Sequence, residues 1–170
     1  MEKTVYEGQI VKVTEEKIGS ITWERVYVPS GVVIFPITDD GKILLIHESR
    51  PHENPPHRIK AVSGILEPEL GSPEENAQRE MQEEIGFKAQ QMELLHHMKG
   101  TGTINHEQYF FIAKGLSPSK LPNPDGEEVI LDIIELTPRE IKEKLLREEL
   151  RWSHSTLGLL KLLMTHYPEV

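Results

Sequence analysis

The sequence predicts an α/β/α sandwich, in which a mixed β-sheet lies between one helix and two C-terminal helices and an N-terminal β-hairpin precedes the core. Three observations predict this class. Strand-like segments dominate the first 46 residues and recur after residue 90, one well-capped helix interrupts them at residues 72–86, and two helical segments end the chain. A chain of 170 residues is within the range of one domain, so we expect residues 1–29 to form the hairpin and residues 30–170 the core.

The N-terminal elements follow from alternation of polar and apolar residues. Thr4–Val13 and Ile21–Val28 alternate with a period of two, as half-buried strands do, and they predict a hairpin. Gly31–Ile37 and Lys42–Ile46 are almost entirely apolar, and an Asp-Asp-Gly turn joins them into a second hairpin. Residues 50–58 contain three prolines, which disfavour both helix and central strand, so an exposed loop is expected there.

The helix that follows has a clear start and a clear end. Ser72 is expected to cap its N-terminus, Pro73 fits the first helical position, and Glu75 completes a capping box. Gly86 is the expected end of the helix.

The second half of the chain is predicted as three strands and two helices. A cap like the first, Thr137-Pro-Arg-Glu, opens the first of these helices. The expected strands are Met92–Met98, Gln108–Ala113 and Val129–Leu136, and the expected helices are Thr137–Leu150 and Ser155–His166.

The overall composition excludes several functional classes. The chain has 19 basic and 28 acidic residues and a formal charge of −9, which repels a nucleic-acid backbone, so extended nucleic-acid binding is not expected. A small anionic substrate would need a local source of positive charge. There is no run of about eighteen apolar residues, which argues against a membrane protein, and the absence of cysteine fits a cytoplasmic location.

Three glutamates on the helix at 72–86 lie beside its apolar stripe. Successive helical residues turn by about 100°. The stripe is therefore made by Ala77, Met81 and Ile85, and the acidic arc by Glu80, Glu83 and Glu84. Like charges one turn apart repel, and the negative end of the helix dipole adds to the cost. A divalent cation with oxygen ligands, Mg²⁺ or Mn²⁺, relieves this conflict. A solvated acidic face is the alternative.

The same helix carries a family signature. Residues 79–87, REMQEEIGF, match position by position the second half of the box that defines the Nudix hydrolases. Residues 64–71, GILEPELG, resemble the glycine-rich first half. Here Gly71 stands where the box expects glutamate, and the spacing back to Gly64 is one residue longer than usual, so the role of that glutamate passes to Glu69 or is lost.

Within that family the layout is most similar to ADP-ribose and nucleoside diphosphate sugar pyrophosphatases. Trp23-Glu24-Arg25 resembles their N-terminal strand, Arg50-Pro51 their phosphate-facing Arg-Pro, and Asp125–Glu128 their acidic catalytic loop. A departure occurs at residues 60–64, KAVSG, where these enzymes often read Glu-x-Pro-Ala-Gly. The departure bears most on which substrate is used.

The resemblance assigns a metal site and its ligands. Glu80 and Glu84 would be the principal ligands of Mg²⁺ or Mn²⁺, with Glu83 as a further ligand and catalytic residue and the backbone carbonyl of Ser63 completing the site. Arg79, four residues before Glu83, would hold that carboxylate in place, or would be an ordinary surface ion pair.

Other residues are expected to act on substrate and water. Glu127 or Glu128 is the candidate general base, with a solvated turn as the alternative. Arg50, together with Arg25, would bind phosphate oxygens, and Trp23 would stack on a nucleobase or lie half-buried in its strand.

Three functions remain open at this stage. The first is metal-dependent hydrolysis of ADP-ribose or a nucleoside diphosphate sugar to a nucleoside monophosphate and a sugar phosphate. The second is hydrolysis of dinucleoside polyphosphates, nucleoside triphosphates or capped RNA ends, and the third is a catalytically degenerate nucleotide-binding domain. The N-terminal hairpin resembles the segment by which related pyrophosphatases exchange domains, so a homodimer is expected.

Overall fold

The fold was obtained as a computed structural model, which describes residues 1–122 and 129–170. Its central sheet has the strand order β7-β4-β10-β8. The strands are β4 (Gly31–Pro36), β7 (Val62–Ile65), β8 (Phe87–Lys99) and β10 (Glu107–Pro118). β10 runs parallel to β4, whereas the other two pairings are antiparallel, so the sheet is mixed as expected.

A second sheet adjoins the first through the predicted core hairpin. It has the order β11-β5-β6, formed by β5 (Ile43–Ser49), β6 (His57–Lys60) and β11 (Ile130–Leu136). The turn between β4 and β5 closes through Gly41, whose φ of 81° only glycine adopts without strain. Both edge strands pair antiparallel with β5.

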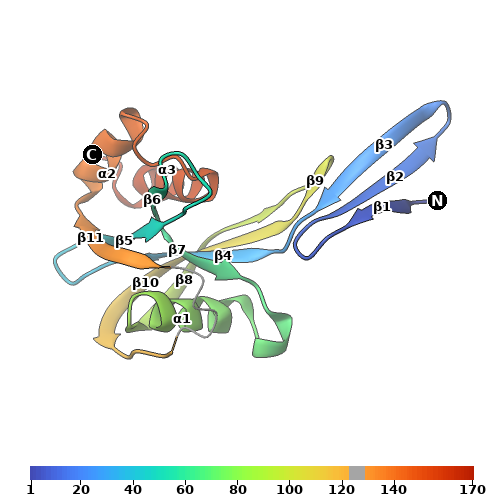
Figure 1. The fold of residues 1–170 in the computed structure, drawn as a ribbon. Coiled ribbons are helices and arrows are strands. Elements are labelled where there is room, and N and C mark those ends of the chain that lie inside the picture. Colours follow the sequence, from blue (N-terminus) through green and yellow to red (C-terminus); the bar gives the residue numbers. More distant parts are fainter. Residues whose placement is uncertain (123–128) are drawn as a thin grey trace.

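Helices cover opposite faces of the sheets, which makes the sandwich (Figure 1). α1 (Pro73–Glu84) lies on one face, and α2 (Pro138–Leu146) and α3 (Ser153–His166) lie on the other. The alternation in β4 explains both layers: Val32 and Ile34 pack in a cluster with Met81 of α1, whereas Val33 and Phe35 pack in another with α2 and α3. All four strand residues are fully buried. The α/β/α class is confirmed.

The helix caps are those that the sequence predicts. The Ser72 hydroxyl accepts from the Glu75 N–H, and the Glu75 carboxylate accepts from the Ser72 N–H at 2.7 Å. Thr137 and Glu140 make the same pair of bonds at the start of α2. Gly86 follows α1 with a φ of 75°, and its N–H reaches the Met81 carbonyl.

The N-terminal segment differs from the expected hairpin. It is a three-stranded meander of β1 (Lys3–Glu7), β2 (Lys12–Ile18) and β3 (Ile21–Tyr27), because the predicted first strand breaks before Lys12. It projects from the core as an arm (Figure 1). β9 (Ile104–Asn105) lies between two of the expected strands, where no strand was predicted; it pairs parallel with β3 and ties the arm to the β8–β10 hairpin.

Two further differences concern the region between β5 and α1. Residues 57–60 and 62–65 form strands β6 and β7, which the proline-rich loop obscured in the sequence pattern. A short 3₁₀ turn, Pro68–Leu70, then leads into α1. Among the described residues, no helix has the length and apolar character that crossing a membrane requires.

Candidate metal and substrate site

The three box glutamates lie where α1 meets β7. Glu83 and Glu84 are 8% and 5% exposed, so they do not form a solvated acidic face. One Glu84 oxygen, Oε2, accepts from the Ser63 N–H at 2.9 Å, which ties the end of α1 to β7. The Glu80 carboxylate lies against Gly64, where a Cβ would overlap it. Glycine at position 64 therefore leaves the space that the Glu80 carboxylate occupies.

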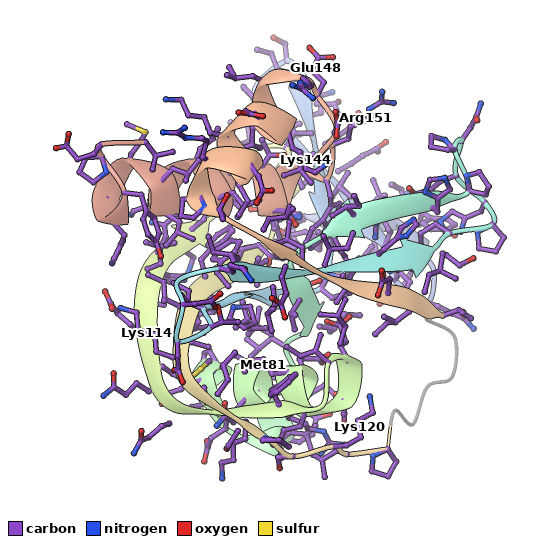
Figure 2. All side chains as sticks on the ribbon, turned by 90° about the vertical axis from the view of Figure 1, so that its left-hand side faces the viewer. Met81, Lys114, Lys120, Lys144, Glu148 and Arg151 are labelled. Atoms are coloured by element: carbon purple, nitrogen blue, oxygen red, sulfur yellow. The ribbon has the colours of Figure 1, made fainter. Side chains whose placement is uncertain are left out.

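Two of the three glutamates, Glu83 and Glu84, are paired with cations of the chain. Nε of Arg79 donates to Glu83 Oε1 at 2.8 Å, and Nζ of Lys60 donates to Glu84 Oε1 at 3.1 Å. At the negative end of the helix dipole, Nζ of Lys120 donates to the Glu83 carbonyl at 2.6 Å, and Figure 2 shows Lys120 beside that end of α1. The repulsion expected from the sequence is thus reduced in part by cations of the chain itself.

Lys60 is the most deeply buried of these cations. Its side chain is 2% exposed, and Lys60 is the last residue of β6. Besides Glu84, its ammonium donates to the Ser63 hydroxyl at 2.8 Å and lies 3.5 Å from both the Ser63 carbonyl and Glu48 Oε2. A lysine buried this far requires such oxygen partners, because an unpaired ammonium in the interior is very costly.

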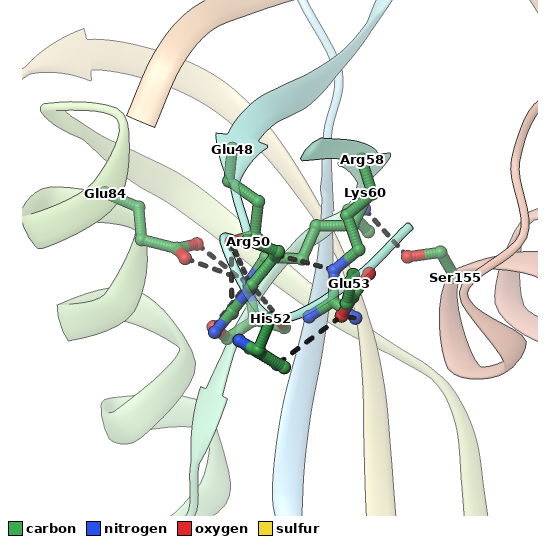
Figure 3. A network of polar contacts seen from close by, with 10 residues as sticks. Glu48, Arg50, His52, Glu53, Arg58, Lys60, Glu84 and Ser155 are labelled. Atoms are coloured by element: carbon green, nitrogen blue, oxygen red, sulfur yellow. Dashed lines mark hydrogen bonds and ion pairs between the residues drawn. The ribbon is translucent and has the colours of Figure 1, made fainter. Parts of the chain in front are cut away.

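Glu48 joins Lys60 to two arginines (Figure 3). It is fully buried at the end of β5, and its Oε1 accepts from Arg50 Nε at 2.8 Å and from Arg58 Nε at 2.6 Å. Arg58 also donates to Glu53 at 2.9 Å. The network therefore fixes two guanidinium groups and one ammonium close together, at the edge of the sheet that faces α1.

The residues fit a hard divalent cation in their donor chemistry. Three carboxylates and the Ser63 carbonyl present oxygen ligands, the type that Mg²⁺ and Mn²⁺ prefer. Within residues 1–122 and 129–170, however, no three His, Asp or Glu side chains already converge on one metal position. Glu83 is drawn toward Arg79 and Glu84 toward Lys60, which explains why the carboxylates are held apart.

Two adjoining clefts open beside these residues. The first, of about 240 Å³, includes Arg50, Lys60, Ser63 and Gly64 in its lining. The second, of about 460 Å³, lies between the loop after β5 and the segment joining α2 to α3. Arg58 and Trp152 line both clefts, and the Arg58 guanidinium lies 5.4 Å from the centre of the Trp152 ring.

A histidine pair lies at the rim of the first cleft. Nε2 of His154 is 3.2 Å from Nε2 of His106, and the buried Nδ1 atom of each ring has no hydrogen-bond partner. Burial, and then the neighbouring His106, lowers the pKa of His154. The shift favours the neutral form of His154 over the imidazolium.

Comparison with known proteins decides the family. Residues 28–157 match the family model described as the NUDIX domain. The chain belongs to the Nudix family. It is 32% identical over 151 residues to a protein named methanol dehydrogenase activator from Bacillus methanolicus, covering 82% of this chain and 80% of that protein. A crystal structure titled ADP compounds hydrolase has the same fold, with a TM-score of 0.81, 20% identity, and coverage of 99% of this chain and 93% of that chain.

The Nudix fold brings together most of the residues proposed from the sequence. Glu80 lies against Gly64 and Glu84 accepts from the Ser63 N–H, so two of the three glutamates contact the strand that carries Ser63. Arg50 lines the same cleft as Ser63. The Ser63 carbonyl lies 3.5 Å from the Lys60 ammonium, which also donates to Glu84.

Arg25 and Trp23 lie elsewhere in this Nudix domain. Both are on β3, in the arm; Trp23 is 52% exposed, and Arg25 pairs with Glu16 at 3.1 Å and with Glu2 at 3.6 Å. Neither lines the clefts beside α1. Their role in substrate binding therefore depends on whether an arm reaches the cleft of another chain.

The candidate bases Glu127 and Glu128 lie outside the described residues. The segments that flank them are placed: the Leu121 N–H donates to the Gln82 carbonyl on α1 at 3.1 Å, and the Val129 carbonyl accepts from the Ser49 N–H at 2.9 Å. Both ends of that segment are thus anchored near the site, one at α1 and one at the end of β5.

Sequence reasoning missed four residues of the site: Glu48, Arg58, Lys60 and Trp152. One signal was available for Lys60, because it stands where related pyrophosphatases often have the glutamate of Glu-x-Pro-Ala-Gly. The other three are ordinary residues in sequence, and only the pairing of β5 with β6 and the position of the α2–α3 segment bring them to the cleft.

Proposed function

We propose that this Nudix enzyme hydrolyses the pyrophosphate linkage of ADP-ribose or a nucleoside diphosphate sugar, giving a nucleoside monophosphate and a sugar phosphate. One observation carries the proposal: the box glutamates lie beside a cleft into which Arg50, Arg58 and Lys60 bring positive charge. In a chain with a formal charge of −9, this is a local site for a diphosphate. The fold shared with a structure titled ADP compounds hydrolase supports the same substrate class.

The proposed metal site uses Glu80, Glu83, Glu84 and the Ser63 carbonyl, with Mg²⁺ as the ion and Mn²⁺ as a substitute. A dication bound there neutralises phosphate oxygens and makes the attacking water more acidic. Arg50, held by Glu48 at 2.8 Å, is oriented to pair with a phosphate oxygen through its guanidinium group. Glu127 or Glu128 is proposed to take the proton from the attacking water.

The size of the two clefts is consistent with a two-part substrate. The diphosphate would occupy the smaller cleft, beside Arg50 and Ser63, and one of its two substituents would extend past Arg58 and Trp152 into the larger cleft. An indole face and a guanidinium group suit a planar base or a sugar with several hydroxyl groups.

A substrate panel with Mg²⁺ tests the proposal. ADP-ribose and nucleoside diphosphate sugars are compared with dinucleoside polyphosphates, nucleoside triphosphates and capped RNA, and products are identified by chromatography. We expect the first group to be turned over with the highest kcat/KM, and Glu83→Gln and Glu84→Gln to reduce it strongly. Preference for the second group would replace the proposed substrate, and nucleotide binding without product in any metal would indicate a degenerate domain.

A second candidate function comes from the relative in Bacillus methanolicus. That protein is named a methanol dehydrogenase activator, and the chain covers 80% of its length. We therefore include activation of a dehydrogenase as a candidate, tested by adding the purified chain to an alcohol dehydrogenase and measuring its turnover. Stimulation that disappears in Glu84→Gln would link both activities, whereas no stimulation would leave hydrolysis alone.

We further propose a homodimer formed through the arm, and a cytoplasmic location in keeping with the absence of cysteine. Several large apolar side chains of the arm are exposed: Val5, Tyr6, Ile10, Ile18, Ile21 and Trp23. By the strand register, Ile18, Ile21 and Trp23 lie on one face of the arm, which a second copy can cover. Sedimentation should give a dimer for residues 1–170 and a monomer for residues 30–170, and a monomeric full-length chain would contradict this.

A further inference from the structure

Two of the oxygen groups assigned above to a dication are in contact with a cation of the chain itself. The Lys60 ammonium lies 3.1 Å from Glu84 Oε1 and 3.5 Å from the Ser63 carbonyl. We propose that Lys60 is a resident counter-ion, which neutralises Glu84 in the metal-free enzyme, competes with the dication, and moves toward Glu48 when the dication binds. This inference rests on the proposed metal site.

Burial explains why a counter-ion is needed there. The Glu84 side chain is 3% exposed and that of Glu48 is fully buried, so each carboxylate has lost most of its hydration. A buried carboxylate without a cation is strongly destabilising. The Lys60 ammonium lies 3.5 Å from Glu48 Oε2 and 3.1 Å from Glu84 Oε1, and therefore stabilises both when no metal is bound.

Competition follows from the position of the ammonium. A dication accepts carboxylate oxygens at about 2.0–2.1 Å for Mg²⁺, and it would bring its positive charge close to an ammonium bound to the same Glu84 oxygen. Like charges at such a distance repel strongly in a site with little water. Lys60 must therefore leave Glu84 Oε1 before the ion can use it.

Glu48 provides the second position for Lys60. Its Oε2 is already 3.5 Å from the Lys60 ammonium, so a small change in side-chain torsion transfers the charge from Glu84 to Glu48. The change involves only the side chain, so the backbone can stay in place. It is held there because Lys60 pairs with Ile46 of β5 and the Ala61 N–H donates to the Ser155 hydroxyl at 2.8 Å.

The decisive experiment measures Mn²⁺ binding in the absence of substrate, by electron paramagnetic resonance and calorimetry. Lys60→Met keeps the length of the side chain, removes its charge and adds no oxygen ligand. We expect it to bind Mn²⁺ at least about tenfold more tightly than wild type. Lys114→Met, which changes an exposed lysine of β10, is the matched control and should bind Mn²⁺ as wild type does.

A second variant tests the same inference if Lys60→Met fails to fold. Ser63→Ala removes the hydroxyl that accepts from Lys60 at 2.8 Å but keeps the Ser63 carbonyl, so it loosens the ammonium without removing a proposed ligand. Its Mn²⁺ affinity should rise about threefold or more. If Mn²⁺ affinity is unchanged or lower in both variants, the proposed role of Lys60 is wrong, but the metal site stands. If the wild type binds no Mn²⁺, the metal site of the proposed function is wrong as well.

Discussion

The carboxylate of Glu80 lies against the Cα of Gly64, in the space that a Cβ would occupy. Gly64→Ala should therefore displace the Glu80 carboxylate from its place beside β7. We expect kcat/KM for the nucleotide substrate to fall by about 100-fold or more, because the displaced carboxylate is a proposed metal ligand. Steady-state kinetics in Mg²⁺ and circular dichroism of the variant measure the two effects separately.

Gly41→Ala is the matched control for that substitution. A Cβ at Gly41 would meet open space in the β4–β5 turn, although the φ of Gly41 is positive, at 81°. The control should lose about 1 kcal/mol of stability and retain its activity. Equal loss of activity in both variants would show that the contact between Gly64 and Glu80 has no special importance.

The ion pair between Arg79 and Glu83 should matter more for activity than for stability. Arg79 Nε and Glu83 Oε1 are 2.8 Å apart, but the Arg79 side chain is 41% exposed. Arg79→Gln should therefore change the free energy of unfolding by less than about 1 kcal/mol. The kcat should fall about tenfold, because Glu83 loses the group that orients it. Arg147→Gln removes an exposed pair of the same spacing with Glu143 on α2 and should leave kcat unchanged.

Asn76 fixes the loop that departs from the family pattern. It is 3% exposed; its Oδ1 accepts from the Glu67 N–H at 2.9 Å, and its Nδ2 donates to the carbonyls of Glu67, Gly71 and Ser72. Asn76→Ala should lower the free energy of unfolding by about 2–3 kcal/mol, since these backbone groups lose their partner. Urea denaturation measures the change, and Gln91→Ala on exposed β8 should be within about 0.5 kcal/mol of wild type.

Glu107 predicts a pH dependence of stability below pH 4.5. Hydrogen bonds from Lys99, then Tyr109 and His97, lower the pKa of Glu107 from 4.5 to about 2. The unfolded chain therefore binds a proton at Glu107 between pH 4.5 and about 2 while the folded chain does not, so stability falls as pH falls through this window. In urea titrations at several pH values, Glu107→Gln should show a smaller loss over the window than wild type.

Glu24→Gln is the control for the pH series, because it removes an exposed glutamate of β3. Its stability should change with pH in parallel with that of wild type. If Glu107→Gln and wild type gave parallel profiles too, the Lys99–Glu107 contact of 2.7 Å would contribute nothing measurable to folding.

Local features were predicted well from the sequence. The capping box at Ser72 and Glu75, the glycine stop at Gly86 and the apolar stripe of α1 all depend on residues within one or two turns, and all three are present. The box motif identified the family for a similar reason, because its spacing is fixed by the geometry of a single helix. The meander of the arm was predicted less well, since its registers depend on pairing between separate strands.

The cationic half of the site could not be predicted in the same way. Lys60 reads as one more charged residue beside a proline-rich loop, and Glu48 as a polar residue at the end of a strand. The repulsion among Glu80, Glu83 and Glu84 suggested that an ion from solution was needed to balance them, but Arg79, Lys60 and Lys120 already supply positive charge. Contacts between residues far apart in the sequence decide which charges are paired, and the spacing of residues along the sequence does not reveal these contacts.

By itself, the sequence determined that a capped helix carries three glutamates beside an apolar stripe, that strands of both kinds surround it, and that the chain is a Nudix protein. Only the tertiary structure decided that Lys60 and Glu48 meet Glu84 in one buried network, and that Trp23 and Arg25 lie on an arm away from it. The physical reason is the sequence separation of the interacting residues. Helix caps and apolar stripes depend on residues close together in sequence, whereas a buried charge is paired through the packing of strands that are far apart in the chain.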